Sequence, residues 1–454
     1  MPLKIPRNRR LARRLGAKRV DFLESAANSI SRILPHAEAY EWSIGNYAES
    51  RTSFEDTTHR QINVTIGIRT GDGYSLSCKV RRRKVPTGVG AIQRTLDLRE
   101  LHLCEAIVAQ LADLFSTDAA PSDQVIAGLA GIFDELVIAR YLRETHDLEM
   151  DPERIFAALR SLAEQTYENR ALVFGCIIDA ARTERPAVDA RFPEDFLAKK
   201  RFRALSDAYY TAYLVSGNGA VVEFLDLPAQ RGQVAPRTFF PEWCRDLAVA
   251  SRDRRIGLGL TRNGDLLVFD GGTLRFTYRF GRWQYWNHTH LVDLLKNSAR
   301  VQRVPRQIIP RVIASIYRAV LDVSFRRSGG MFVIIRNRNR LSEVVRAADQ
   351  IGNDRRAALS RQFDTALPST RIQQFPRTLI VELAALDGAI VLSNQGELLA
   401  YGAVLEPKRR GKVDAEEGSR TKAAIGASNY GLAIKVSSDG DITVYVRGKE
   451  FIRV

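Results

Sequence analysis

The chain has 454 residues, of which 45% are hydrophobic and 26% are charged, a balance typical of globular proteins and not of disordered or fibrous chains. At about 150 residues per domain, this length favours roughly three domains. Lys and Arg number 68 against 52 Asp and Glu, and the net charge of +16 favours anionic partners such as nucleic acid, nucleotides or acidic lipid. No apolar run reaches the length of about 18 residues that a transmembrane helix needs, so we expect no membrane span.

The cysteines give no sign of a disulfide framework or a structural zinc site, because they are far apart and form no CxxC pair. They are Cys78, Cys104, Cys176 and Cys244. The start of the chain is basic but lacks the apolar region of a secretory signal, so we expect a cytoplasmic protein with reduced thiols. The basic arm at residues 4–19 favours a solvated terminus, with contact to phosphate backbones or membrane surfaces as the alternative.

Residues 1–148 are predicted to form an N-terminal α+β domain of unknown role. Its expected elements are strands at residues 39–44, 61–69 and 74–84 and helices at residues 98–115 and 125–142. A turn at residues 70–73 with two glycines predicts a hairpin between the last two strands. The histidines here are scattered, and the pattern indicates no catalytic constellation.

Residues 149–295 are predicted to form a second, sheet-rich domain. Asp151 and Pro152 are typical of a helix start, and a helix is expected at residues 153–167. Among the strand-like segments that follow, the Asn263-Gly264 turn predicts a tight hairpin. An aromatic cluster closes the segment, comprising Phe276, Tyr278, Phe280, Trp283, Tyr285 and Trp286. It favours a sheet core or a domain interface, and stacking on a base is the alternative.

Residues 296–454 are predicted to form a mixed β-sheet flanked by helices. Because two α+β domains precede it, the predicted fold class of the chain is α/β, and more narrowly α+β. A helix is expected at residues 305–323, with Pro310 disturbing its first turns. Residues 329–335 read as a strand covered on both faces. Further strands are expected at residues 379–386, 389–393, 396–405, 432–438 and 442–448, and a helix at residues 420–428.

Two short motifs in this third domain could carry chemistry. The first is Asp387-Gly388-Ala389, expected at the end of a hydrophobic strand. Its carboxylate could hold a divalent metal, and its two small residues would let a ligand approach the backbone. Alone the motif is weak, since Asp-Gly is most often a turn.

The second motif, at residues 418–424, joins a loop to a helix. Ser419 is a suitable N-cap residue, and Arg420 and Lys422 add positive charge near free helix N-terminal amides. This combination indicates an anion site of the kind that phosphates occupy. A capped helix start with a solvated basic turn is the alternative. The basic loop at residues 408–412 lies close enough in sequence to reach the same phosphates.

Together, residues 386–448 closely resemble the catalytic half of diadenylate cyclase domains, which make cyclic di-AMP from two ATP molecules. Such domains carry Asp-Gly-Ala, then Gly-Thr-Arg-His-Arg-Ala-Ala, then a strand that ends in Val-Ser and acidic residues. Here the first motif is intact, and the second reads Gly-Ser-Arg-Thr-Lys-Ala-Ala. Residues 329–335 extend the resemblance toward the start of such a domain.

The resemblance implies a mechanism in which two domains face each other and each 3′-hydroxyl attacks the α-phosphate of the other ATP, so that the enzyme is a homo-dimer or a higher homo-oligomer. Asp387 would hold Mg²⁺ or Mn²⁺, with Asp439 as a second metal ligand. The catalytic residues would be Asp387, Arg420, Thr421 and Lys422. The nucleotide-binding residues would be Gly388, Ala389, Gly418, Ser419 and Leu405.

The chain departs from the family pattern at three places. Thr421 replaces a histidine, and Lys422 replaces an arginine, which keeps the charge but loses the bidentate fork. Ser438-Asp439 stands where the family has two acidic residues. An inactive nucleotide-binding domain or a different cyclic product therefore stays open.

Some diadenylate cyclases carry an N-terminal sensory domain, and residues 149–295 resemble such a module. We therefore expect the first two domains to control how two catalytic domains meet. The rival hypothesis is a nucleic-acid-binding regulator that acts through basic segments at residues 81–84, 199–203 and 336–340. Basic runs this dispersed are more often solvated faces, which favours the enzyme, but nucleic acid stays a candidate partner.

Overall fold

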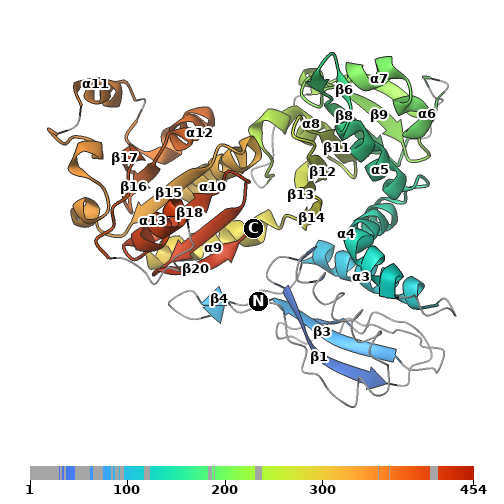
Figure 1. The fold of residues 1–454 in the computed structure, drawn as a ribbon, viewed down its shortest axis with the longest axis horizontal. Helices are drawn as coiled ribbons and strands as arrows, with labels where there is room; N and C mark the ends of the chain where they lie inside the picture. The colour runs from blue at the N-terminus through green and yellow to red at the C-terminus, as the bar shows by residue number, and fades with distance from the viewer. Residues whose placement is uncertain are drawn as a thin grey trace. The chain divides into compact units, whose positions relative to one another are not determined.

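The computed structural model describes most of the chain after residue 97 and short segments before it (Figure 1). The described residues are 30, 33–34, 37–45, 62–64, 75–82, 85–86, 91–92, 97–116, 123–182, 187–188, 190–230, 238–355, 357–367, 369–409 and 418–454. They fall into two compact units. Unit 1 comprises Met1–Lys84, Gln93–Thr238 and Trp243–Trp286, and unit 2 comprises Val85–Ile92, Phe239–Glu242 and Asn287–Val454. The basic arm at residues 4–19 and the turn at residues 70–73 lie outside the described residues.

Unit 1 opens with a three-stranded antiparallel sheet in the order β1-β3-β2, followed by two helices. These elements are β1 (Ala37–Gly45), β2 (Ile62–Val64), β3 (Ser75–Arg82), α3 (Leu98–Ser116) and α4 (Asp123–His146). They confirm the strands and helices that the sequence predicts for this region. The apolar spacing in both helices, with Leu103, Ile107 and Val137 buried, explains why the pattern was readable.

The rest of unit 1 is built on a seven-stranded mixed sheet in the order β10-β9-β8-β11-β12-β13-β14, in which only β8 and β9 are parallel to each other. Its strands are β8 (Phe174–Asp179), β9 (Thr211–Ser216), β10 (Val221–Asp226), β11 (Ile256–Leu260), β12 (Leu266–Asp270), β13 (Thr273–Arg279) and β14 (Arg282–Tyr285). The accompanying elements are α5 (Pro152–Ala163), β6 (Thr166–Tyr167), β7 (Arg170–Ala171), α6 (Glu194–Leu197), α7 (Lys200–Leu205), α8 (Arg245–Ala250) and the 3-10 helices Pro228–Gln230 and Glu242–Cys244. The Asn263-Gly264 hairpin is confirmed, since β11 and β12 pair across it and Gly264 has a φ of 76°.

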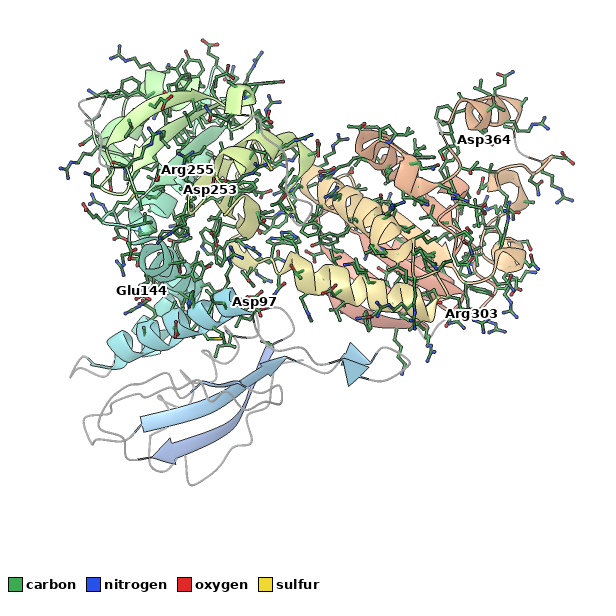
Figure 2. All side chains as sticks on the ribbon, turned by 180° about the vertical axis from the view of Figure 1, so that it is seen from behind. Asp97, Glu144, Asp253, Arg255, Arg303 and Asp364 are labelled. Carbon is green, nitrogen blue, oxygen red and sulfur yellow. The ribbon has the colours of Figure 1, made fainter. Side chains whose placement is uncertain are left out.

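The aromatic cluster of unit 1 is mainly core. Phe276, Trp283, Tyr285 and Trp286 are at most 4% exposed, whereas Phe280 is 61% exposed. The indole N–H of Trp286 donates to the hydroxyl of Thr277 at 3.0 Å, which satisfies its polar atom inside the sheet layer. The buried members are therefore not a free platform for stacking a base. Arg255, labelled in Figure 2, donates to the buried carboxylate of Asp179 at 2.8 Å.

Unit 2 contains a six-stranded mixed sheet in the order β17-β16-β15-β18-β19-β20, which confirms the predicted architecture. Its strands are β15 (Gly330–Ile335), β16 (Ala389–Leu392), β17 (Leu398–Ala403), β18 (Gly431–Val436), β19 (Ile442–Val446) and β20 (Lys449–Arg453). Its helices are α9 (His288–Val301), α10 (Ile309–Arg326), α11 (Ala358–Ala366), α12 (Arg377–Ala385) and α13 (Ser419–Ser428). The pair β4 (Val85–Pro86) and β5 (Ala91–Ile92) and the 3-10 helices Arg338–Glu343, Ala347–Asp349 and Ile372–Gln374 complete it. All six residues of β15 are buried, as expected for a central strand.

Two features of unit 2 differ from the sequence predictions. Residues 377–385 form helix α12, so the strand predicted at residues 379–386 is wrong. Its buried side chains, such as Ile380 and Ala384, lie on one side of the helix, while Glu382 is exposed. Helix α9 was not predicted, and the expected domain boundary at residue 295 falls inside it. The division of the chain into three domains stays a prediction.

The two faces of the six-stranded sheet have different coverings. Met331 and Ala433 pack with Ile425 of α13 in one apolar cluster, which places α13 on their face. On the other face, a Cβ added to Gly330 would lie 3.1 Å from Val323 of α10 and 3.0 Å from the carbonyl oxygen of Ala384 of α12. The sheet is therefore the middle layer between α13 and the group formed by α9, α10 and α12 (Figure 1).

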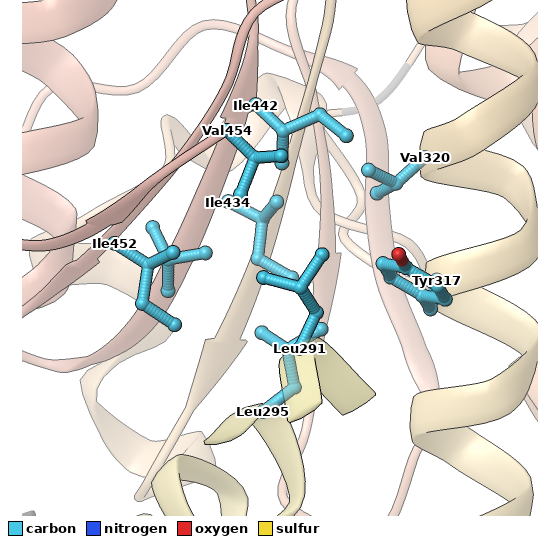
Figure 3. Close-up of a pocket in the computed structure, with 9 residues that line it drawn as sticks. Leu291, Leu295, Tyr317, Val320, Ile434, Ile442, Ile452 and Val454 are labelled. Atoms are coloured by element: carbon cyan, nitrogen blue, oxygen red, sulfur yellow. The ribbon is translucent and has the colours of Figure 1, made fainter. Parts of the chain in front are cut away.

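The face opposite α13 contains a small apolar pocket (Figure 3). Side chains from α9, α10, β18, β19 and β20 line it, among them Leu291, Tyr317 and Ile434. Burial raises the pKa of Tyr317 well above its ordinary value, and its hydroxyl lies 2.8 Å from Nδ1 of His288. No charged side chain lines this pocket, so it is unsuited to a phosphate ligand. Within the part of the chain that the structure describes, no helix is both long and apolar enough to cross a membrane.

Candidate functional site

One edge of the six-stranded sheet brings together the two sequence motifs. Strands β15 and β16 run parallel and begin at this edge, whereas β17 and β18 run antiparallel to them and end there. The register places Ala389 opposite Ala403 and Gly330 opposite Val436. The residues just before β15 and β16 and just after β17 and β18 therefore meet at the same edge.

Asp387 lies at this edge between α12 and β16. It precedes a strand, and the expectation that it ends one is wrong, because α12 occupies the preceding residues. Its side chain is 98% exposed. Leu386 beside it is 46% exposed, so the carboxylate projects from an open part of the surface. An exposed carboxylate of this kind is free to take a cation or a charged ligand at low desolvation cost.

Gly388 is required by the backbone of the neighbouring strand. It has a φ of 128°, and a Cβ at this position would lie only 2.4 Å from the carbonyl carbon of Gly402 in β17. Any side chain would therefore displace either β17 or the Asp387 backbone. Ala389 is 2% exposed, and its methyl group packs in the apolar cluster on the α13 face. These two small residues set the position of Asp387 in this structure.

Arg420 joins the second motif to the first. Its Nη2 donates to Oδ1 of Asp387 at 3.3 Å, across 33 residues of sequence. The guanidinium also lies over the backbone at the start of β15, where a Cβ on Gly329 would be 2.6 Å from Nη1. Gly329 has a φ of 67°, so both its conformation and this close approach favour glycine. Three separate segments therefore fix the position of one cation beside one carboxylate.

The first turn of α13 carries the remaining residues of the second motif. Gly418 is the N-cap, with no side-chain hydrogen bond to the helix, and the predicted cap Ser419 is instead the first helical residue. Gly418, Ser419 and Lys422 are exposed, and Thr421 is half-buried. Thr421 accepts a hydrogen bond at 2.7 Å from Nζ of Lys435 in β18, a residue that the sequence did not single out.

Two further predicted site residues follow strands that end at this edge. Leu405 comes two residues after β17, is half-buried against the α13-face cluster, and forms a backbone bridge with Val345. Asp439 is exposed in the turn between β18 and β19, next to Ser438. The amide nitrogen of Ser438 lies 3.7 Å from the Cβ position of Gly329. The turn that carries Asp439 is therefore beside the segment that Arg420 covers.

The donor set suits a metal ion shared with a ligand rather than one held by protein alone. Among the described residues, no group of three or more His, Cys, Asp or Glu side chains could hold a metal ion. Asp387 offers a single exposed carboxylate. Mg²⁺ is commonly bound by one or two carboxylates, with phosphate oxygens and waters completing its shell. The arrangement therefore fits a Mg²⁺ or Mn²⁺ ion that arrives with a nucleotide.

Arg377, at the start of α12, anchors the segment that leads to Asp387. It donates to both carboxylate oxygens of Asp322 in α10, at 2.6 and 2.7 Å, and to Glu242 at 2.9 Å. Burial raises the pKa of Asp322 above its ordinary value, and the charge of Arg377 opposes that shift. The sequence analysis did not predict these contacts, because nothing in the spacing of residues 242, 322 and 377 relates them.

The basic segments of the rival hypothesis are partly engaged within the protein. In the third segment, Arg338 pairs with Glu397 at 3.1 Å, and Arg340 lies 3.7 Å from Glu343. In the second, Lys200 lies over the ring of Tyr167, 4.8 Å from its centroid. Of the first, only residues 81–82 are described. These pairings are typical of solvated surface charges.

No protein-family model matches the sequence, and no curated protein matches it. Two solved structures are similar to part of the chain. A hypothetical membrane spanning protein from Bacillus cereus is 20% identical, with a TM-score of 0.25, over 37% of this chain and 76% of that one. A double mutant of DacA from Staphylococcus aureus is 22% identical, with a TM-score of 0.21, over 31% of this chain and 86% of that one. TM-scores this low do not establish a common fold.

Proposed function

We propose that the protein is a diadenylate cyclase that condenses two ATP molecules into cyclic di-AMP and two pyrophosphates. One observation carries the proposal: Arg420 of the second motif donates to Asp387 of the first at 3.3 Å. The sequence resemblance assigns a metal ion to Asp387 and phosphates to Arg420. Their closeness at one sheet edge supports the proposal that both act on the same nucleotide.

Each residue has a role that follows from its position. Asp387 holds the Mg²⁺ or Mn²⁺ ion, which when bound neutralises phosphate charge and lowers the pKa of the attacking hydroxyl. Arg420 binds phosphate oxygens, and the open first turn of α13 directs backbone amides at them. In each half-reaction a 3′-oxygen bonds to an α-phosphorus, the bond to pyrophosphate breaks, and the hydroxyl proton is released.

The reaction requires two copies of the chain. One site edge holds one ATP, and its 3′-hydroxyl must reach the α-phosphate of an ATP on the partner copy. The exposure of Asp387 and Leu386 at the edge is compatible with a facing partner. We infer a homo-dimer or higher homo-oligomer in the cytoplasm, where ATP is available. Unit 1 would act as the sensor that controls how the sites meet, with DNA or RNA as candidate signals.

The decisive experiment incubates the purified protein with each nucleoside triphosphate and Mg²⁺ or Mn²⁺, and identifies the products by mass spectrometry. The proposal expects cyclic di-AMP and two pyrophosphates from ATP. The rate of cyclic di-AMP formation per subunit should rise with protein concentration, because two half-sites must pair. ATP binding without any cyclic product would instead favour the alternative, a nucleotide-sensing regulator. A cyclic product made from another nucleoside triphosphate would support the proposed site but would show that its substrate is not ATP.

A further inference from the structure

Lys435 is a cation inside unit 2 that the two motifs do not include. It lies in β18, opposite Met331 of β15 and Thr443 of β19. Its neighbours Ala433 and Ile434 contact opposite faces of the sheet, and Lys435 shares the α13 face with Ala433. The aliphatic stem is half-buried between sheet and helix, and Nζ reaches Thr421 Oγ1 at 2.7 Å. An ammonium group is thus placed against the first turn of α13.

This placement opposes the usual electrostatics of a helix. The N-terminus of an α-helix carries partial positive charge, so cations are disfavoured there and favoured at the C-terminus. Here Arg420 and Lys422 already lie in the first turn of α13, and Lys435 adds a third cation from the sheet. Gly418 provides no side-chain cap, and Asp387 pairs with Arg420. A bound anion would turn the same arrangement into a favourable one.

The hydrogen bond also fixes the direction of the Thr421 hydroxyl. An ammonium group can only donate, so Thr421 Oγ1 must accept from Lys435. The hydroxyl hydrogen is then left to be donated to an acceptor. Phosphate oxygens are acceptors only, so the Lys435–Thr421 pair is suited to a phosphate and unsuited to a ligand that presents a donor at this point.

We propose that Lys435 is a positioning residue of the candidate site, which orients Thr421 toward a nucleotide phosphate and adds positive charge behind it. The inference rests on the proposed nucleotide site and goes further, because it assigns selection for the polyphosphate part of the ligand to a strand residue outside both motifs.

The test measures binding separately from turnover. The probe is 3′-deoxy-ATP with Mg²⁺, which lacks the attacking hydroxyl, and adenosine is the reference ligand without phosphates. Dissociation constants are measured by calorimetry on the full-length wild type and on Lys435→Met, Thr421→Val and the double variant. The matched control is Lys449→Met, which removes an exposed lysine from β20 of the same sheet. Thermal melts confirm that each variant folds.

We expect Lys435→Met to weaken 3′-deoxy-ATP about tenfold, the effect of losing one charge-assisted contact, and to leave adenosine unchanged. Adding Lys435→Met to Thr421→Val should cost little more, because the two residues act as one pair. Lys435→Arg should recover part of the affinity. Unchanged affinity in Thr421→Val, which retains the side-chain shape, would overturn the inference even if Lys435→Met failed to fold.

The outcomes separate this inference from the proposed function. A wild type that binds 3′-deoxy-ATP through Lys435 but makes no cyclic product from ATP would overturn the cyclase and keep the inference. If Lys435→Met and Thr421→Val bind 3′-deoxy-ATP as the wild type does and still make cyclic di-AMP, the inference about Lys435 is overturned and the cyclase proposal is kept. A wild type that binds no nucleotide would overturn both.

A second variant pair tests the same contact through its geometry. A histidine at position 421 would need more space than the threonine, whose hydroxyl oxygen already lies 2.7 Å from Nζ of Lys435. Thr421→His alone should therefore reduce 3′-deoxy-ATP affinity, and adding Lys435→Ala should recover only part of it, because the space is vacated but the charge of Lys435 is lost. Equal affinities in the single and double variants would show that Lys435 does not share this space with residue 421.

Discussion

The charged residues at the two ends of helix α12 differ in exposure and in their number of partners. At its start, Arg377 is 17% exposed and donates to Asp322, to Glu242 and to two backbone carbonyl groups. Just beyond its end, Asp387 is 98% exposed and accepts a hydrogen bond from Arg420 at 3.3 Å. In the first set, the Asp322 carboxylate is buried and Arg377 is largely buried, with their partners in place. The second is exposed and held by small residues and backbone.

This difference separates charges that maintain the fold from charges available to a ligand. A buried ion needs partners in the free protein, since desolvating it alone is costly. An exposed carboxylate contributes little to stability and can exchange its partner for a metal or a phosphate-bound cation. Substitutions at the two ends of α12 should therefore affect different measurements, stability at the start and catalysis at the end.

The largest expected effect is on catalysis at Asp387. Asp387→Asn removes the charge that we propose to bind the metal ion, with little change in volume, and we expect product formation to fall by about a thousandfold. The melting temperature should not change, because the side chain is exposed. Mass spectrometry of cyclic di-AMP and a thermal melt provide the two measurements. Turnover near the wild-type rate would remove Asp387 from the mechanism.

At the other end of α12, the expected effect is on stability. Arg377→Met leaves Asp322 buried without its main partner, which should lower the free energy of unfolding by about 3–5 kcal/mol. Chemical denaturation measures this loss. The double variant Arg377→Met, Asp322→Leu should recover much of it, since the buried carboxylate is then removed together with its partner. No recovery would mean that the loss comes from packing of the arginine stem.

The pH dependence of that loss follows from the raised pKa of Asp322. A carboxyl group whose pKa is raised by folding gives stability that is present at low pH and is lost as pH rises through the folded-state value. Without Arg377, the pKa of Asp322 rises further, because the charge that lowers it is gone. The stability difference between wild type and Arg377→Met should therefore shrink as the pH is lowered from neutral toward acid values. A constant difference would show that Asp322 does not titrate in this range.

Much of the fold of unit 2 could be predicted from local patterns, but α12 could not. The run at residues 379–392 is almost continuously apolar, and such a run does not distinguish a buried strand from a buried helix. The structure divides it at Leu386 into helix α12 and strand β16. The bend between them depends on Gly388, whose contact with Gly402 is set by the pairing of β16 with β17.

The motifs predicted only some residues of the candidate site. The resemblance pointed to Asp387 and Arg420, and the structure brings these two together. It gave no reason to choose Lys435, which reads in the sequence as one polar position in an alternating strand. Its role depends on the packing of α13 on β18, a tertiary contact that no spacing encodes.

Arg420 of α13 contacts Asp387 just beyond the end of α12. The variant Arg420→Ala therefore tests the same site, with a smaller expected effect on product formation than Asp387→Asn. We expect about a tenfold loss of ATP affinity, because a charge-assisted phosphate contact is removed, together with lower product formation. Stability should remain the same, since the guanidinium is 46% exposed. Calorimetric titration with ATP and Mg²⁺ measures the affinity. Unchanged affinity would show that Arg420 only pairs with Asp387.

The smallest effect is expected at a second ion pair between the same two helices. Arg326 of α10 donates to Glu382 of α12 at 2.7 Å, but the side chains are 44% and 65% exposed. Water screens such a pair, so Glu382→Gln should change the free energy of unfolding by less than about 1 kcal/mol and leave product formation unaltered. Arg377 and Glu382 lie on one helix and both face α10, so burial is the main difference between the pairs. If Glu382→Gln were as damaging as Arg377→Met, then contact between α10 and α12 as such, and not the burial of charge, would determine stability. The distinction drawn between the two ends of α12 would then fail.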